Sequence, residues 1–148
     1  MCSQRTRDAR CGQSAPLLKR EFERHLRPLG LFRDAHDERP GGCGIYFISH
    51  VGQHKFSANL LVYRRADAVT TTEEPQINGE TNGESGKGDA EKGQKRDGGE
   101  AAQCIWLARV RPEHCEGIVK YTLLQGKVVK PEDQLRGGFD RMKGVVSW

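Results

Sequence analysis

The chain of 148 residues lacks the features of several large classes of protein. No apolar run approaches the roughly 20 residues of a membrane-spanning helix, so we expect no membrane span. The five cysteines are an odd number, so a secreted disulfide framework would leave one thiol unpaired. No two cysteines have the Cys-x2-Cys spacing of a thiol oxidoreductase. No signal peptide is visible after Met1. These absences favour a reducing compartment in which some thiols serve as metal ligands.

Basic residues outnumber acidic ones, 24 to 20, and the formal net charge is +4. A basic surface of this kind attracts nucleic acid or an acidic protein partner. For the residues of a predicted first helix we favour a solvated surface instead, and we expect no nucleic-acid partner. The basic residues near the N-terminus are Arg5, Arg7, Arg10, Lys19, Arg20, Arg24 and Arg27.

The first half of the chain predicts one helix and two strands. Ser14 as a cap and Pro16 in the first turn predict a helix over residues 14–29. Its apolar residues recur at helical spacing and form one face, comprising Leu18, Phe22, Leu26 and Leu29. The apolar run over 44–49 predicts a buried strand, and 58–63 predicts a second. We expect these two strands to form a hairpin with a functional turn.

Residues 66–101 differ in composition from the rest of the chain, being polar and without aromatic residues. Such a segment buries too little apolar surface to offset its ordering entropy, so we predict a disordered insertion in a hairpin connection. Beyond it, 104–110 predicts a third strand. Pro112 begins a second helix that Gly126 ends. The order of elements predicts an α/β fold, with helices flanking a mixed sheet, in one domain over 1–148.

Two cysteines and two histidines form a candidate metal-ligand set. Cys2 and Cys11 flank a basic segment. His50 and His54 are separated by three residues on a loop that leaves an apolar run. The order of ligand types fits a zinc module, but the nine-position separation of the thiols is wider than usual for one. An iron–sulfur cluster tolerates wider spacing, and histidine can replace two of its cysteines.

The ligand types have consequences for redox chemistry. Two thiolates and two neutral imidazoles give an oxidised [2Fe-2S] centre no net charge, whereas four thiolates give it two negative charges. Its reduction potential should therefore be higher, as in Rieske centres. A ligating imidazole also keeps a second nitrogen whose pKa rises on reduction, which links electron uptake to proton uptake.

Other residues near the candidate ligands have two readings. Arg7 and Arg10 lie near the cluster sulfides, or they pair with Asp8 or with carboxylates of the first helix. Gly12 and Gly52 would let the backbone pass close to a cluster. We expect the remaining cysteines to be buried apolar residues rather than ligands; they are Cys43, Cys104 and Cys115.

Four separated motifs of the chain are similar to the fungal and plant sucrase/ferredoxin-like family. The first is Arg-Asp-Ala-Arg-Cys-Gly over 7–12, and the second is Ser-His-Val-Gly-Gln-His-Lys-Phe-Ser-Ala-Asn over 49–59. The third is Trp-Leu-Ala-Arg-Val-Arg-Pro-Glu over 106–113, and the fourth is Leu-Arg-Gly-Gly over 135–138. The resemblance covers nearly all of the chain outside the predicted insertion.

The resemblance implies a thioredoxin-like ferredoxin domain that binds a [2Fe-2S] cluster through two cysteines and two histidines. The matching positions are Cys2, Cys11, His50 and His54. Where the family normally has an apolar strand before its first cysteine, this chain has only Met1, so we expect Cys2 to fray. The last third is most similar to the mitochondrial branch, named for altered inheritance of mitochondria. The tripeptide 146–148 favours the cytoplasmic alternative.

We therefore expect an electron-transfer or redox-sensing protein, more a carrier than an enzyme. Its expected partners are redox proteins and the iron–sulfur assembly machinery. The alternative is a zinc-stabilised interaction module with a basic face that binds nucleic acid or protein. A third hypothesis, a thiol oxidoreductase on the thioredoxin-like scaffold, requires a reactive cysteine.

Overall fold

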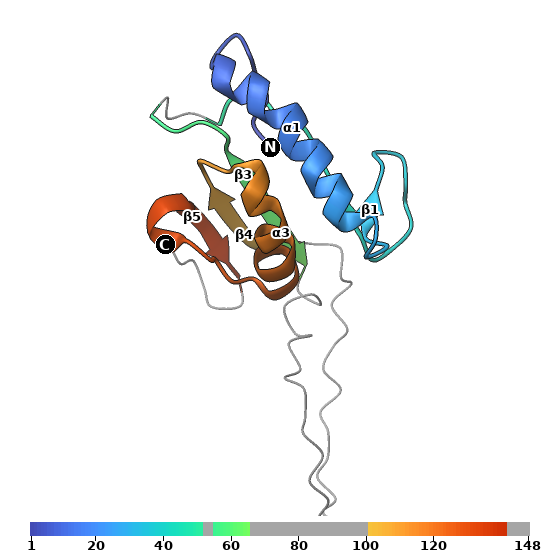
Figure 1. The fold of residues 1–148 in the computed structure, drawn as a ribbon. Coiled ribbons are helices and arrows are strands. Elements are labelled where there is room, and N and C mark those ends of the chain that lie inside the picture. Colours follow the sequence, from blue (N-terminus) through green and yellow to red (C-terminus); the bar gives the residue numbers. More distant parts are fainter. Residues whose placement is uncertain (52–54, 66–100, 142–148) are drawn as a thin grey trace, which may run out of the picture.

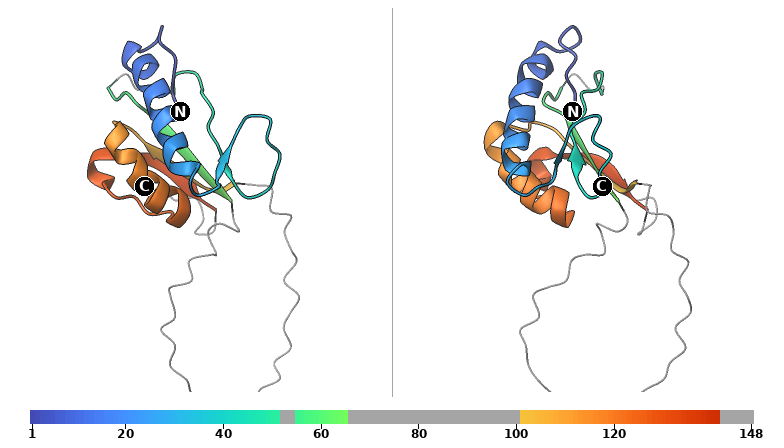
Figure 2. Two further views of the ribbon diagram at one scale, coloured as in Figure 1. Left: turned by 45° about the vertical axis from the view of Figure 1, so that its right-hand side comes forward. Right: turned by 90° about the vertical axis from the view of Figure 1, so that its right-hand side faces the viewer.

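The computed structural model describes residues 1–51, 55–65 and 101–141 (Figure 1). This part of the chain contains two small sheets, two longer helical segments and one short helix. Helix α1, Ala9–Leu26, and the helical segment 112–123 lie side by side over the same face of the larger sheet (Figure 2). Within the described residues, no helix is both long and apolar enough to cross a membrane.

Helix α1 begins earlier and ends earlier than the sequence predicts. Asp8 is the N-cap, and its side chain accepts a hydrogen bond from the backbone N–H of Arg10. Ser14, the predicted cap, lies inside the helix, where its hydroxyl donates to the carbonyl of Arg10. The predicted apolar face is confirmed for Leu18, Phe22 and Leu26, whereas Leu29 lies beyond the helix and is exposed.

The larger sheet is antiparallel and has the strand order β3-β4-β5. Strand β3, Leu60–Arg65, pairs with β4, Ala101–Leu107, and β4 pairs with β5, Leu135–Asp140. Side chains alternate along β3, with Leu60 and Val62 buried in the core. The predicted strands 58–63 and 104–110 are thus present with shifted bounds, while β5 follows a short helix, α4, Pro131–Gln134, that the sequence did not predict.

The second predicted helix is present but is divided into three geometries. A 3-10 turn, Pro112–His114, leads into α3, Cys115–Gly117, and then into a π-helical segment, Ile118–Leu123. Gly126 ends it with φ +71°, a conformation that favours glycine. Buried Arg64 of β3 fixes this end, because its guanidinium donates to the carbonyls of Leu123 and Leu124.

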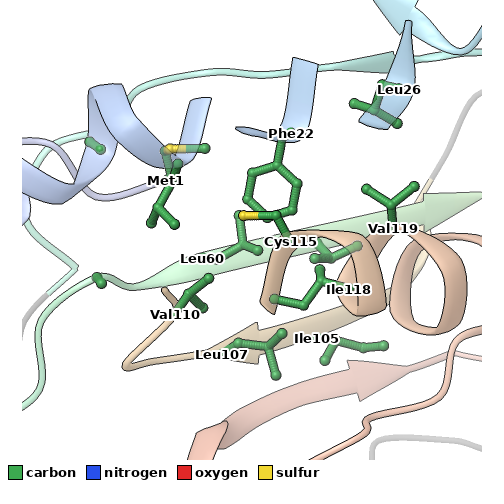
Figure 3. Packing of buried hydrophobic residues seen from close by; sticks show 14 residues of the cluster. Met1, Phe22, Leu26, Leu60, Ile105, Leu107, Val110, Cys115, Ile118 and Val119 are labelled. Atoms are coloured by element: carbon green, nitrogen blue, oxygen red, sulfur yellow. The ribbon is translucent and has the colours of Figure 1, made fainter. Parts of the chain in front are cut away.

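One hydrophobic core lies between the helices and the larger sheet (Figure 3). Side chains from both helical segments meet those from β3 and β4 there. The labelled members are Met1, Phe22, Leu26, Leu60, Ile105, Leu107, Val110, Cys115, Ile118 and Val119. The prediction that Cys104 and Cys115 are buried is confirmed, whereas Cys43 is only partly buried.

The predicted buried strand over 44–49 is wrong. Only β2, Cys43–Gly44, is a strand, and it pairs in parallel with β1, Phe32–Arg33. Tyr46, Phe47 and Ile48 are exposed. Residues of this stretch and of β3 line a cavity of about 360 Å³. Among the described residues the two segments are not paired as strands, so the expected hairpin is wrong. Strand β3 pairs with β4 instead.

The α/β class is confirmed, with parallel pairing in the two-stranded sheet and antiparallel pairing in the three-stranded one. The predicted insertion, 66–101, lies outside the described residues except for Ala101, with which β4 begins. Arg65 and Ala101 are partners in the register of β3 and β4. The two ends of this connection are therefore neighbours where β3 ends and β4 begins.

Candidate metal centre

A short parallel bridge brings the N-terminal segment next to the segment that carries His50. Cys2 bridges Ile48 through two backbone hydrogen bonds, and a third joins Cys2 to Asn59 on its other side. They run from Ser3 N–H to the Ile48 carbonyl at 3.1 Å, from Ile48 N–H to the Met1 carbonyl at 2.9 Å, and from Cys2 N–H to the Asn59 carbonyl at 3.0 Å. The expected fraying of Cys2 is therefore wrong, because Cys2 is 1% exposed and anchored on both sides.

Cys11 reaches the same place from the first turn of α1. Its backbone N–H donates to the carbonyl of Asp8 at 3.0 Å, so the cap that begins the helix also sets the position of this thiol. Gly12 allows a close approach, since a Cβ there would lie 2.6 Å from the Cβ of Arg5. Gly12 thus accommodates the preceding loop rather than a ligand. The other predicted glycine, Gly52, lies outside the described residues.

Three of the four predicted ligands converge. One ligand atom from each of Cys2, Cys11 and His50 lies within 4.8 Å of the others. The sulfur of Cys2 is 3.5 Å from Nδ1 of His50. A tetrahedral ion with bonds of about 2.3 Å to sulfur and about 2.0 Å to nitrogen separates such a pair by about 3.5 Å. The donor set therefore fits a thiophilic metal centre. His54, the fourth predicted ligand, lies outside the described residues.

Burial disfavours the negatively charged form of the Cys11 thiol. It raises the pKa of the Cys11 thiol to about 11, and a hydrogen bond from the backbone of Ala58 acts in the opposite direction. The sulfur of Cys11 is buried, so a thiolate is favoured there only when a cation compensates for its lost hydration. A bound metal ion supplies such a charge. The same burial disfavours a freely reactive nucleophile of the kind that a thiol oxidoreductase needs.

Asn59 organises the site, and the sequence analysis missed it. Its side chain is 2% exposed and makes two hydrogen bonds. The Asn59 amide donates to the carbonyl of Phe56 at 2.9 Å, and its Oδ1 accepts from the indole of Trp106 at 3.1 Å. Its own carbonyl receives the N–H of Cys2. A polar residue directly before an apolar strand was the signal that could have indicated this role.

Several basic residues near the N-terminus pair with carboxylates of the same segment. Arg10 forms an ion pair with Asp8 at 2.9 Å, and this contact lowers the pKa of that carboxyl. The expectation that Arg10 pairs with Asp8 is confirmed. Along α1, Lys19 and Arg27 both pair with Glu23. Part of the predicted basic surface is therefore neutralised by neighbouring carboxylates.

The geometry and the sequence motifs agree with a comparison against known families. The sucrase/ferredoxin-like family matches residues 1–137. The chain belongs to this family. No solved structure matches the chain.

Relatives within the sucrase/ferredoxin-like family carry two kinds of name. Actin patches distal protein 1 of Saccharomyces cerevisiae is 51% identical over 65 residues, which are 44% of this chain and 21% of that protein. Altered inheritance of mitochondria protein 32 of Clavispora lusitaniae is 27% identical over 130 residues, 88% of this chain and 31% of that protein. Its namesake in Meyerozyma guilliermondii is 27% identical over 137 residues, 93% of this chain and 33% of that protein. The chain thus spans a third or less of these relatives.

Proposed function

We propose that this domain is an electron-transfer or redox-sensing module with a [2Fe-2S] cluster held by two thiolates and two imidazoles. The ligands are Cys2, Cys11, His50 and His54. The observation that carries the proposal is the convergence of two sulfurs and one ring nitrogen within 4.8 Å. Membership in a family described as ferredoxin-like supports it. When bound, such a cluster supplies a one-electron redox step.

The residues themselves would determine the proton chemistry of the site. A ligating imidazole keeps one ring nitrogen that can hold or release a proton. Added negative charge at the site favours the protonated form of that nitrogen. The proposal therefore includes a reduction potential that falls as pH rises through neutrality.

The partners and the location of the module are further parts of the proposal. A one-electron carrier needs a donor and an acceptor, so its partners are redox proteins, together with the machinery that inserts the cluster. The names of the Altered inheritance of mitochondria relatives support a mitochondrial location, and Actin patches distal protein 1 supports the cytoplasmic alternative. Microscopy of a full-length fluorescent fusion decides between them.

A zinc-stabilised interaction module is the second candidate, because one distance fits a single tetrahedral ion as well as an iron of the cluster. The 3.5 Å between Cys2 Sγ and His50 Nδ1 matches the edge of a tetrahedron around a single ion. A zinc protein would be colourless and redox-inactive. The pairing of Lys19 and Arg27 with Glu23 leaves this candidate a smaller basic face than the sequence alone indicates.

Metal analysis and spectroscopy test the two candidates. We expect red-brown protein with equal amounts of iron and acid-labile sulfide, and a paramagnetic signal after reduction with dithionite. Cys11→Ser and His50→Ala should lose most of the iron. Cys43→Ser is the matched control, because Cys43 is a partly buried thiol outside the site. Colourless protein with one zinc per chain would refute the cluster and support the zinc module.

A ligand exchange tests the imidazole assignment separately. His54→Cys should keep a cluster, lower its potential and weaken its pH dependence, because a thiolate replaces a neutral ligand. An unchanged potential would count against His54 as a ligand.

A further inference from the structure

Three cations surround the ring of Phe56. The guanidinium carbon of Arg136 lies 3.8 Å from the ring centroid, and that of Arg109 lies at 4.6 Å. The ammonium of Lys55 lies at 5.5 Å. Arg109 and Lys55 are exposed, while Arg136 and Phe56 are partly buried. The negative face of an aromatic ring attracts each cation but does not neutralise it.

The positive charges of this Phe56 cluster are not balanced locally. Among the residues that the structure describes, no carboxylate forms an ion pair with Lys55, Arg109 or Arg136. The carboxylate of Glu113, four residues after Arg109 in the sequence, pairs with Arg111 at 3.7 Å. Three like charges at one ring repel one another, and an anion placed against them relieves that repulsion.

The backbone holds this arrangement at a local cost. Arg109 has φ +55°, a conformation that residues other than glycine rarely adopt. Its N–H donates to the carbonyl of Ser57 at 2.9 Å, which keeps it beside Phe56. Arg136 is oriented through a hydrogen bond from Nη2 to the carbonyl of Asp133 at 2.7 Å. Its Nε is buried without a hydrogen-bond partner among the described residues.

The Phe56 cluster lies close to the candidate metal centre along the chain. Ala58, two residues after Phe56, provides the backbone hydrogen bond to the thiol of Cys11. Asn59, the next residue, binds the N–H of Cys2. Two residues of chain span at most about 7 Å, so the backbone of Phe56 lies within that distance of the residue that hydrogen-bonds the Cys11 thiol.

We propose that Lys55, Arg109 and Arg136 around Phe56 form the docking surface for an acidic protein partner. A compact group of two guanidinium groups and one ammonium matches a few carboxylates of a protein surface. A nucleic-acid backbone instead requires cations spread along a track, and the cations of α1 are largely paired with their own carboxylates. The identification of the partner as an electron donor or acceptor rests on the proposed function. Electron-transfer complexes are small and transient, and charge complementarity sets their rate of association.

Binding of a fluorescently labelled hexaglutamate peptide to the full chain tests the surface without reference to any cofactor. At low ionic strength we expect saturable binding that salt abolishes. Arg109→Gln and Arg136→Gln should each weaken it by about three- to tenfold, and Arg136→Lys should retain most of it. Arg27→Gln is the matched control, since Arg27 stacks on Phe32 at 4.3 Å elsewhere in the fold. Circular dichroism confirms that each variant is folded.

Three outcomes of this measurement would overturn the proposal. They are the absence of salt-sensitive binding, equal losses in Arg27→Gln and Arg136→Gln, and tighter binding of a single-stranded DNA oligonucleotide than of the peptide. The last result would assign the surface to nucleic acid.

A second measurement links the surface to electron transfer. Dithionite-reduced protein, freed of excess reductant, is mixed with ferricyanide or with tris(phenanthroline)cobalt(III), each of which takes one electron. The anionic oxidant should react faster, and Arg136→Gln should slow it while leaving the cationic oxidant unaffected or faster. If Arg136→Gln changed the reaction rates of both oxidants equally, the oxidant would not approach through this surface, and the proposal would be overturned. A protein without a reducible centre would refute the proposed function and leave the peptide measurement as the test of docking.

Discussion

Replacing Asn59 by alanine tests whether one buried amide organises the candidate metal centre. The change removes the hydrogen bond to the Phe56 carbonyl at 2.9 Å and the one from Trp106 at 3.1 Å. Each lost hydrogen bond costs about 1 kcal/mol, and each partner left without water costs up to about 1 kcal/mol more. The free energy of unfolding should therefore fall by about 2–4 kcal/mol. With a typical dependence on urea, the unfolding midpoint falls by roughly 1–2 M.

The assay is urea unfolding followed by tryptophan fluorescence, with iron content measured on the same samples. Ser14→Ala is the control, because the hydroxyl of Ser14 also donates to a backbone carbonyl, that of Arg10, but on an exposed helix surface. We expect the control to change the free energy of unfolding by less than about 0.5 kcal/mol. Because Asn59 also receives the N–H of Cys2, folded Asn59→Ala protein should retain less metal. Equal midpoints for Asn59→Ala and Ser14→Ala would refute the reasoning.

The remaining predictions concern one buried arginine and two titrating groups. Arg64→Met should lower the free energy of unfolding by about 3 kcal/mol, since three acceptors lose their donor; chemical denaturation measures this. Burial raises the pKa of Cys115 to about 12 from 9.0, so its contribution to stability is complete below pH 9 and is lost as pH rises toward 12. Thermal melts should show that loss, and Cys115→Ala should reduce it. Arg39 lowers the pKa of Asp37 to about 2 from 3.8, so this pair stabilises above pH 3.8 and ceases to do so as pH falls through 2. An NMR titration should return the Asp37 pKa toward 3.8 in Arg39→Gln; an unshifted value would contradict the assignment.

The sequence predicts those elements whose signals are local. The helical spacing of Leu18, Phe22 and Leu26 correctly predicts the buried face of α1. Its first residue was missed because both Asp8 and Ser14 are good N-caps, and only the structure shows which one binds the backbone. Strand β5 was missed because its sequence, Leu-Arg-Gly-Gly-Phe-Asp, contains two glycines and little alternation.

Features that depend on contacts between distant residues were predicted less well. The run 44–49 has the composition of a buried strand, but its expected partner β3 pairs with β4, which begins after 35 intervening residues of the chain. The convergence of Cys2 with His50 depends on a bridge between residues 46 positions apart, Cys2 and Ile48. Local spacing carries no information on such a pairing, so the ligand set was proposed from residue types and family motifs. The Phe56 cluster combines three separate segments and had no local signal.

Arg65 and Ala101 lie opposite each other in the pairing of β3 and β4, so another sequence can be inserted between them. The 35 residues between β3 and β4 join positions that are already neighbours, so a four-residue turn could replace them. A connection shortened in this way has a free-energy cost of closure that is lower by about 2 kcal/mol. Arg65 lies at one end of β3, and Asn59, which binds Cys2, lies at the other end. The length of β3 separates them by about 20 Å. An affinity handle or a reporter domain inserted between Arg65 and Ala101 would leave the thiols and the imidazole undisturbed.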